Sequence, residues 1–271
     1  MNFRSSLAAL FLMFSTMPLV WAEASTYAGE LDLGVKASLT GRYEDAVIHF
    51  RQAIAAAPDQ PTAHLYLATA YAEKYIPGVE RPDNVAIADA AVGQFKKVLS
   101  LNPPPQIQLA ALKALGSLYF NMKKFDLARE THLKVTELDP EHPESYFALG
   151  VIDWTESYKV RMAEKARLKL RADQPLINSE SCWMVRAANE IKVNDGLDML
   201  TKAISRRHDY DDAMAYMNLL FRERADIQCG NSEAYRRDLT QADKWVDLTM
   251  ATKKHKAEKP SSSPAPPRRP D

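Results

Sequence analysis

The sequence predicts an all-α protein built as an α-solenoid of stacked antiparallel helix pairs. Three observations lead to this fold class. Only 9 glycines occur among 271 residues, helix-favouring Ala, Leu, Lys and Glu are abundant, and one pattern of large and small apolar residues recurs at a fixed spacing. Because one helix pair cannot bury its apolar face alone, a recurring pair predicts a stack of pairs.

The recurring pattern is clearest in two segments, which begin at Leu33-Gly34 and at Leu115-Gly116. In both segments an aromatic residue, a small residue and a closing proline follow at the same distances. The matched positions are Tyr43 and Phe125, Ala46 and Ala128, Phe50 and His132, Ala53 and Val135, and Pro58 and Pro140. Small residues let two helices approach closely, and a proline stops the second helix because it lacks an N–H.

This pattern resembles the tetratricopeptide repeat (TPR), over roughly Tyr27 to Lys244. Its period of 34 residues separates Leu33 from Leu67, Leu115 from Leu149, Leu149 from Trp183, and Trp183 from Met217. Leu67 and Leu115 are 48 residues apart, with proline-bearing insertions at Glu73–Asp83 and around Pro103–Gln106. The resemblance implies a TPR superhelix of about five to six repeats plus a C-terminal capping helix, Ser232–Met250.

The predicted array covers residues 25–251, with helix pairs near 27–60, 61–108, 109–142, 143–176, 177–210 and 211–251. The last three units are placed by the period more than by the motif. Residues 252–271 are expected to be a disordered, Pro-rich, basic tail, with a net charge of +4 in a chain of zero formal net charge. A Pro-rich recognition motif is the alternative interpretation of this tail.

Residues 1–24 have the pattern of an export signal. Arg4 precedes an uncharged apolar run, Leu7 to Trp21, and Ala22 and Ala24 place small residues at the two positions that a signal peptidase reads. Cleavage after Ala24 is expected, with Ala22 as the alternative site and an uncleaved membrane anchor as the alternative fate. The mature protein is then expected without a membrane span, in the bacterial periplasm or secreted.

No catalytic constellation, metal site or cofactor site is predicted. The six histidines lack zinc-ligand spacing, and neither Cys-x-x-Cys nor a Gly-rich phosphate loop occurs. His132 falls at a second-helix core position and is expected to be packed. Asp209, Asp211 and Asp212 could bind calcium, but a helix cap by Asp211 or Asp212 is the preferred interpretation. The body of the chain has no basic face that suits nucleic acid.

The TPR resemblance implies that the first helix of each pair lines a concave groove that holds a protein or peptide. The candidate groove residues are Lys113, Ser117, Phe120, Asn121, Phe147, Trp154, Asn189 and Arg222. Phe120, Phe147 and Trp154 could instead be core residues between repeats. The chain is therefore predicted to be an extracytoplasmic scaffold or adaptor and not an enzyme; the alternative is a structural subunit of an envelope secretion, pilus or outer-membrane assembly complex. Its partner and its oligomeric state stay open.

The two cysteines, Cys182 and Cys229, invite a disulfide in an exported chain. The repeat register predicts the opposite. It places them near opposite ends of two parallel first helices, about 20 Å apart at ~1.5 Å per residue. A disulfide needs Cα atoms within about 7 Å, so two separate thiols are expected.

Overall fold

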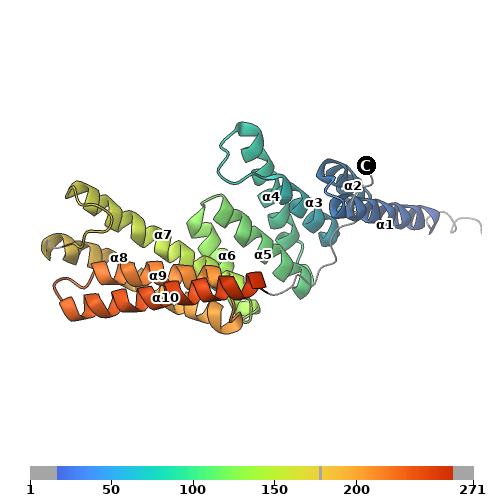
Figure 1. Cartoon of the computed structure of the whole chain (residues 1–271). Helices are drawn as coiled ribbons and strands as arrows, with labels where there is room; N and C mark the ends of the chain where they lie inside the picture. The colour runs from blue at the N-terminus through green and yellow to red at the C-terminus, as the bar shows by residue number, and fades with distance from the viewer. Residues whose placement is uncertain (1–16, 177–178, 259–271) are drawn as a thin grey trace, which may run out of the picture. The chain divides into compact units, whose positions relative to one another are not determined.

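The computed structural model describes residues 17–176 and 179–258, and within these ranges the regular secondary structure is helical throughout. The predicted all-α class and helix-pair solenoid are confirmed. The helices are α1 (Met17–Leu39), α2 (Tyr43–Ala56), α3 (Pro61–Lys74), α4 (Pro82–Ser100), α5 (Pro105–Asn121), α6 (Phe125–Leu138), α7 (Pro143–Arg167), α8 (Ser179–Arg206), α9 (Asp211–Asp226) and α10 (Ser232–Glu258) (Figure 1).

The chain divides into two compact units between Met122 and Lys123. In the first unit, α1 packs on α2, α2 on α3, α3 on α4, and α4 on α5. The expected close approach of the first helix pair is present, because a Cβ added to Gly34 would overlap the ring of Phe50. Phe50 is 1% exposed, so it fills the space that the glycine leaves.

Asn84 fixes the insertion between α3 and α4. Its Oδ1 accepts a hydrogen bond from the Ile76 N–H at 2.9 Å, and its Nδ2 donates to the carbonyl oxygens of Ile76 and Val79 at 2.8 and 2.7 Å. The buried amide therefore satisfies the backbone of the loop, and the extra residues are accommodated at a helix–helix connection.

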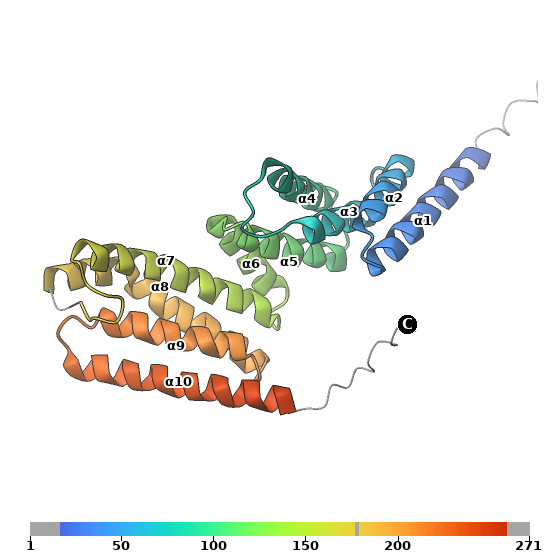
Figure 2. The ribbon, with the colours of Figure 1, turned by 45° about the horizontal axis from the view of Figure 1, so that its top comes forward.

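The second unit differs from the predicted repeat lengths. After α6, the chain forms α7 to α10, of which α7, α8 and α10 have 25, 28 and 27 residues; α8 packs on α7 and α9, and α10 packs on α9 (Figure 2). The segments expected as two helix pairs, near 143–176 and 177–210, hold one pair: α7 with 25 residues and α8 with 28. The next pair is α9 and α10, so the expected capping helix is the second helix of the last pair.

Two glycines let α7 and α8 approach closely. A Cβ on Gly150 would lie 2.7 Å from Leu200 Cγ and 3.2 Å from the carbonyl oxygen of Gly196. A Cβ on Gly196 would lie 3.0 Å from Asp153 Cβ on α7 and 2.9 Å from a methyl group of Leu220 on α9, so this glycine lets α8 approach both helices. Leu200 and Leu220 are fully buried, so these side chains have little room to move.

We expect Gly150→Ala to destabilise the protein by about 1–3 kcal/mol through overpacking. Gly93→Ala is the matched control: Gly93 is also helical, but nothing lies within 4 Å of its added Cβ. This control should be neutral or stabilising by about 0.5–1 kcal/mol. Thermal unfolding of both variants measures the difference, and an unchanged midpoint for Gly150→Ala would contradict the close approach.

The predicted ends of the array lie partly outside the described residues. Both predicted cleavage points, after Ala24 and after Ala22, fall within α1. The first part of the predicted export signal, residues 1–16, lies outside the described residues. α10 continues to Glu258, so residues 252–258, assigned to the tail from the sequence, are helical; residues 259–271 are outside. No helix in the described part of the chain is long and apolar enough to cross a membrane.

Candidate functional site

Five aromatic side chains form a continuous row between α7 and α9 in the second unit. The row is Tyr210, Phe147, Tyr216, Trp154 and Tyr158, in that order. Successive ring centroids are 5.0, 5.6, 5.2 and 5.2 Å apart, within the range in which aromatic rings attract each other. We call these residues the aromatic row.

The row is partly open to solvent. Tyr210 is buried, Phe147, Trp154 and Tyr216 are half-buried, and Tyr158 is 37% exposed. The indole Nε1 of Trp154 is covered and has no hydrogen-bond partner among the described residues. Burial raises the pKa of Tyr210 to about 12, and burial followed by the charge of Asp212 raises the pKa of Tyr216. Both phenols are therefore neutral at physiological pH and offer apolar faces with a polar tip.

The predicted groove residues separate into different environments in the second unit. Phe147 and Trp154 are brought together, because both rings touch Tyr216 at 5.6 and 5.2 Å. Asn189 differs from the prediction: it is 1% exposed and donates to the carbonyl oxygen of Ser157 at 2.8 Å. Arg222 is exposed on α9, and it pairs with Asp243 of α10 at 2.8 Å.

The other four predicted groove residues lie on α5, in the first unit. Lys113, Ser117, Phe120 and Asn121 share one face of that helix by their spacing. Lys113 and Phe120 are half-buried, while Ser117 and Asn121 are exposed. The Ser117 hydroxyl donates to the carbonyl oxygen of Lys113 at 3.0 Å. Whether these four residues bind a ligand stays a prediction.

Buried charges lie beside the aromatic row. Arg161, whose guanidinium lies 5.4 Å from the Tyr158 ring centroid, donates to both carboxylate oxygens of Glu223 at 2.7 Å. Asp226 accepts from Arg161 at 2.9 Å and from Lys165 at 2.6 Å. Glu223 and Lys165 are 2% and 1% exposed. Two cations thus balance two carboxylates, and the network fixes α9 against α7. We call these four residues the buried ion network.

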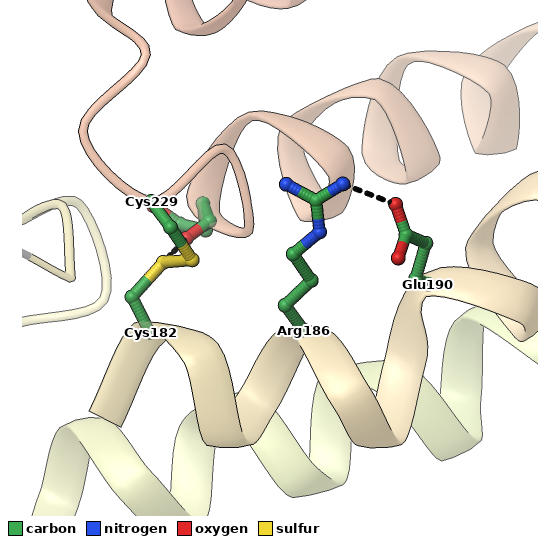
Figure 3. Close-up of a disulfide and its surroundings, with 5 residues drawn as sticks. Cys182, Arg186, Glu190 and Cys229 are labelled. Carbon is green, nitrogen blue, oxygen red and sulfur yellow. Dashed lines mark hydrogen bonds and ion pairs between the residues drawn. A yellow bond between two sulfur atoms is a disulfide. The ribbon is translucent and has the colours of Figure 1, made fainter. Parts of the chain in front are cut away.

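A disulfide joins Cys182 to Cys229, with the two Cα atoms 5.4 Å apart (Figure 3). The prediction of two separate thiols is wrong. Because α8 is one continuous helix, it runs antiparallel to α9, and its beginning lies beside the end of α9. The bond therefore ties the start of α8 to the turn between α9 and α10, where Cys182 Sγ lies 3.4 Å from the carbonyl oxygen of Asp226.

Two smaller predictions are resolved by the contacts. His132 is 2% exposed and its Nδ1 lies 3.0 Å from the Ser145 hydroxyl, so the core interpretation is confirmed. The cap prediction is wrong, because α9 begins at Asp211 and its N-cap residue, Tyr210, makes no side-chain cap hydrogen bond. Asp211 instead pairs with Lys256 near the end of α10, at 2.5 Å.

Asp153 is a buried carboxyl with a raised pKa. It is 2% exposed and accepts from Arg129 of α6 at 2.7 Å. The pKa of Asp153 is raised to about 6 because burial and the nearby charges of Asp195 and Glu156 outweigh the lowering by Arg129; burial is the largest cause. Since an aspartate in the unfolded chain releases this proton near its ordinary pKa of 3.8, the folded state binds it more tightly. This carboxyl therefore contributes stability that grows as the pH falls from about 7 toward 4.

We expect Asp153→Asn to remove that part of the pH dependence. Thermal unfolding of the wild type and the variant between pH 4 and 7 measures it, and the wild type should lose more stability than the variant as the pH rises. Asp198→Asn is the control, since Asp198 is an exposed carboxylate on α8 paired with Lys202. If wild type and Asp153→Asn lose the same stability as the pH rises, the folded state does not bind the Asp153 proton more tightly than the unfolded state, and the prediction is wrong.

Sequence reasoning found two of the five rings in the aromatic row. Tyr158, Tyr210 and Tyr216 were not predicted; Tyr210 and Tyr216 join the row through the packing of α9 on α7, a tertiary contact that the repeat pattern does not contain. One signal was available: Phe147, Trp154 and Tyr158 are spaced by 7 and 4 residues, which places three aromatic residues on one face of a helix. The buried ion network had no sequence signal, since charged residues on a helix usually face solvent.

Comparisons with known proteins agree with the fold. Two family models described as tetratricopeptide repeat match residues 32–76 and residues 111–142. Among solved structures, the fold is similar to a crystal structure of MamA protein, with a TM-score of 0.55, 15% identity, and coverage of 89% of this chain and 100% of that one. A second, MamA 41-end from Desulfovibrio magneticus RS-1, has a TM-score of 0.57, 13% identity, and coverage of 87% and 98%. A search of curated proteins found no match. At these identities the structural likeness concerns the fold.

Proposed function

Because this chain is a tetratricopeptide-repeat protein, we propose that it is an extracytoplasmic adaptor that binds another protein along the aromatic row of its second unit. The repeats and the fold support a scaffold for protein–protein interaction. The observation that carries the finer proposal is the row itself: five rings in mutual contact, partly open to solvent, on two helices joined by a buried ion network. Rigid aromatic groups of this kind anchor protein partners at little cost in conformational entropy.

Two observations support an extracytoplasmic location. The sequence of residues 1–24 has the pattern of an export signal. Both cysteines of the chain are joined in one disulfide, and disulfides persist mainly in oxidising compartments such as the periplasm or the extracellular space.

We expect Trp154→Ala to weaken capture of the protein partner, because it removes the ring that links Tyr216 to Tyr158 in the row. Truncation of a central aromatic anchor typically costs more than about 2 kcal/mol of binding, or roughly thirtyfold in affinity. Crosslinking the tagged full-length chain in its native cells, followed by pull-down, measures the yield of the complex. Circular dichroism must show that the variant stays helical.

A second candidate function, a structural subunit of an envelope complex, is favoured by α8. The first half of this helix exposes Trp183, Met184 and Ile191, which are 55%, 52% and 76% exposed. Further along the same face the exposed residues are polar: Asn194, Asp195 and Asp198. Exposed apolar patches of this kind can mark protein interfaces.

Trp183→Ala separates the two candidates. If the protein is an adaptor that binds through the aromatic row, Trp183→Ala keeps partner capture and Trp154→Ala loses it. If the protein is a permanent subunit that packs through α8, the result reverses, and the wild type elutes from native extracts at a large mass on size exclusion.

A further inference from the structure

We propose that the Pro-rich C-terminal segment of the chain, residues 260–270, is a ligand of the aromatic row and competes there with the external partner. This inference rests on the proposed function, because it assigns a second occupant to the same surface. It is argued from where α10 ends, from the length of the segment and from its chemistry.

The helix that precedes the segment ends at one end of the row. Lys256 of α10 lies 2.5 Å from the carboxylate of Asp211, and Thr252 donates to the Met214 sulfur at 3.4 Å. Asp211 directly follows Tyr210, the first ring of the row. The chain therefore leaves α10, at Glu258, beside Tyr210.

The segment is long enough to follow the row. Thirteen residues, 259–271, follow the end of α10, and in an extended polyproline conformation they span roughly 40 Å at ~3.1 Å per residue. The row consists of four centroid steps, each between 5.0 and 5.6 Å. A connection of a few residues thus leaves ample chain to reach Tyr158.

The chemistry of the segment fits an aromatic surface. Five prolines occur within residues 260–270, and each restricts its backbone to extended conformations, which lowers the entropy lost on binding. Aromatic-lined grooves are a recurring partner of Pro-rich segments. The charges also match, because Lys259 directly follows α10 and the exposed carboxylate of Asp212 lies at the Tyr210 end of the row.

A ligand tethered to its own protein binds at a high effective concentration, in the millimolar range for a short flexible connection. An external partner then has to displace the segment. The tail thereby sets the affinity that a partner needs, and weak ligands of the row are excluded.

The test uses two full-length proteins and one synthetic peptide. The proteins are the wild type and a variant in which the five tail prolines, Pro260, Pro264, Pro266, Pro267 and Pro270, are replaced by alanine. The peptide has the sequence of residues 259–271, and a control peptide carries alanine at its proline positions. Binding is measured by the fluorescence anisotropy of dye-labelled peptides, which can be followed in every variant. In the proteins that keep Trp154, its indole N–H resonance, assigned with Trp154→Phe, also reports whether the peptide contacts the row.

The proline-free protein should bind the peptide saturably, and the wild type should bind it about tenfold or more weakly, because its own tail occupies the row. The control peptide should bind neither protein. In the proline-free background, Trp154→Ala should abolish binding, whereas Trp183→Ala should leave it unchanged.

Three results would overturn the inference: no saturable binding to the proline-free protein at millimolar peptide, equal affinities of the two proteins, or binding that Trp154→Ala leaves intact. Weaker binding by a wild type that elutes as a dimer, where the proline-free protein elutes as a monomer, would assign the tail to a neighbouring copy and reject the intramolecular contact. Failure of the proposed function looks different, because there the peptide binds normally and Trp154→Ala leaves partner capture unchanged.

Discussion

Glu223→Ala is expected to destabilise the second unit by about 3–5 kcal/mol, the cost of breaking a buried ion pair from one side. The carboxylate of Glu223 receives two hydrogen bonds from Arg161, both at 2.7 Å, and the glutamate is 2% exposed. Its removal leaves the buried guanidinium of Arg161 paired with Asp226, which already binds Lys165. Urea unfolding followed by tryptophan fluorescence measures the change in free energy.

Two controls isolate the buried charge. Replacing both partners with apolar residues, as in Arg161→Met with Glu223→Leu, should cost far less than the single substitution, because no charge is left unpaired. Arg222→Ala removes an exposed pair with Asp243 and should change stability by less than about 1 kcal/mol. A loss below about 1 kcal/mol for Glu223→Ala would mean that the network is solvated in solution.

The second large effect is expected from loss of the disulfide. Replacing Cys182 and Cys229 together with serine should destabilise the protein by about 2–4 kcal/mol, because the bond joins residues 47 positions apart and restricts the unfolded chain. A thiol reductant should lower the wild-type unfolding midpoint by a similar amount and leave the double variant unchanged. Mass spectrometry after alkylation without reduction should find both cysteines unmodified. A reductant that leaves the wild-type midpoint unchanged would contradict this assignment.

The first repeats were predictable because their motif has a direct packing meaning. Gly34 faces Phe50, and both Ala46 and Ala53 are fully buried, as the small and large positions of the pattern require. Prolines also end the second helices in this part of the chain, which fixes the pair boundaries.

The later repeats were harder to predict because the period continues while the helices lengthen. Leu149, Trp183 and Met217 are 34 residues apart, yet α7 and α8 together form one pair. No proline occurs between Pro143 and Pro175 or between Pro175 and Pro260, so the stop signals of shorter pairs are missing. That absence was a usable sign of long helices, and it also explains the error about the cysteines, whose separation depends on the direction of α8.

The candidate site was only partly predictable for a related reason. An aromatic residue on the first helix of a pair occupies the same position in the sequence pattern whether its ring packs between helices or binds a partner. Phe147 and Trp154 do pack, on Tyr216, and they still leave part of the row open. The contribution of Tyr210 depends on α9 lying beside α7, a tertiary contact that helical periodicity does not contain.

Site-specific photo-crosslinking tests the central claim most directly, that the aromatic row binds a protein partner. A photoreactive amino acid replaces Tyr158, the 37% exposed end of the row, in the full-length chain in its native cells; a second variant carries it at Ile191 on α8, which is 76% exposed. The account predicts one discrete adduct from position 158 that disappears when Trp154→Ala is added, and no such adduct from position 191. An adduct from position 191 alone, or an adduct from position 158 that survives Trp154→Ala, would contradict it.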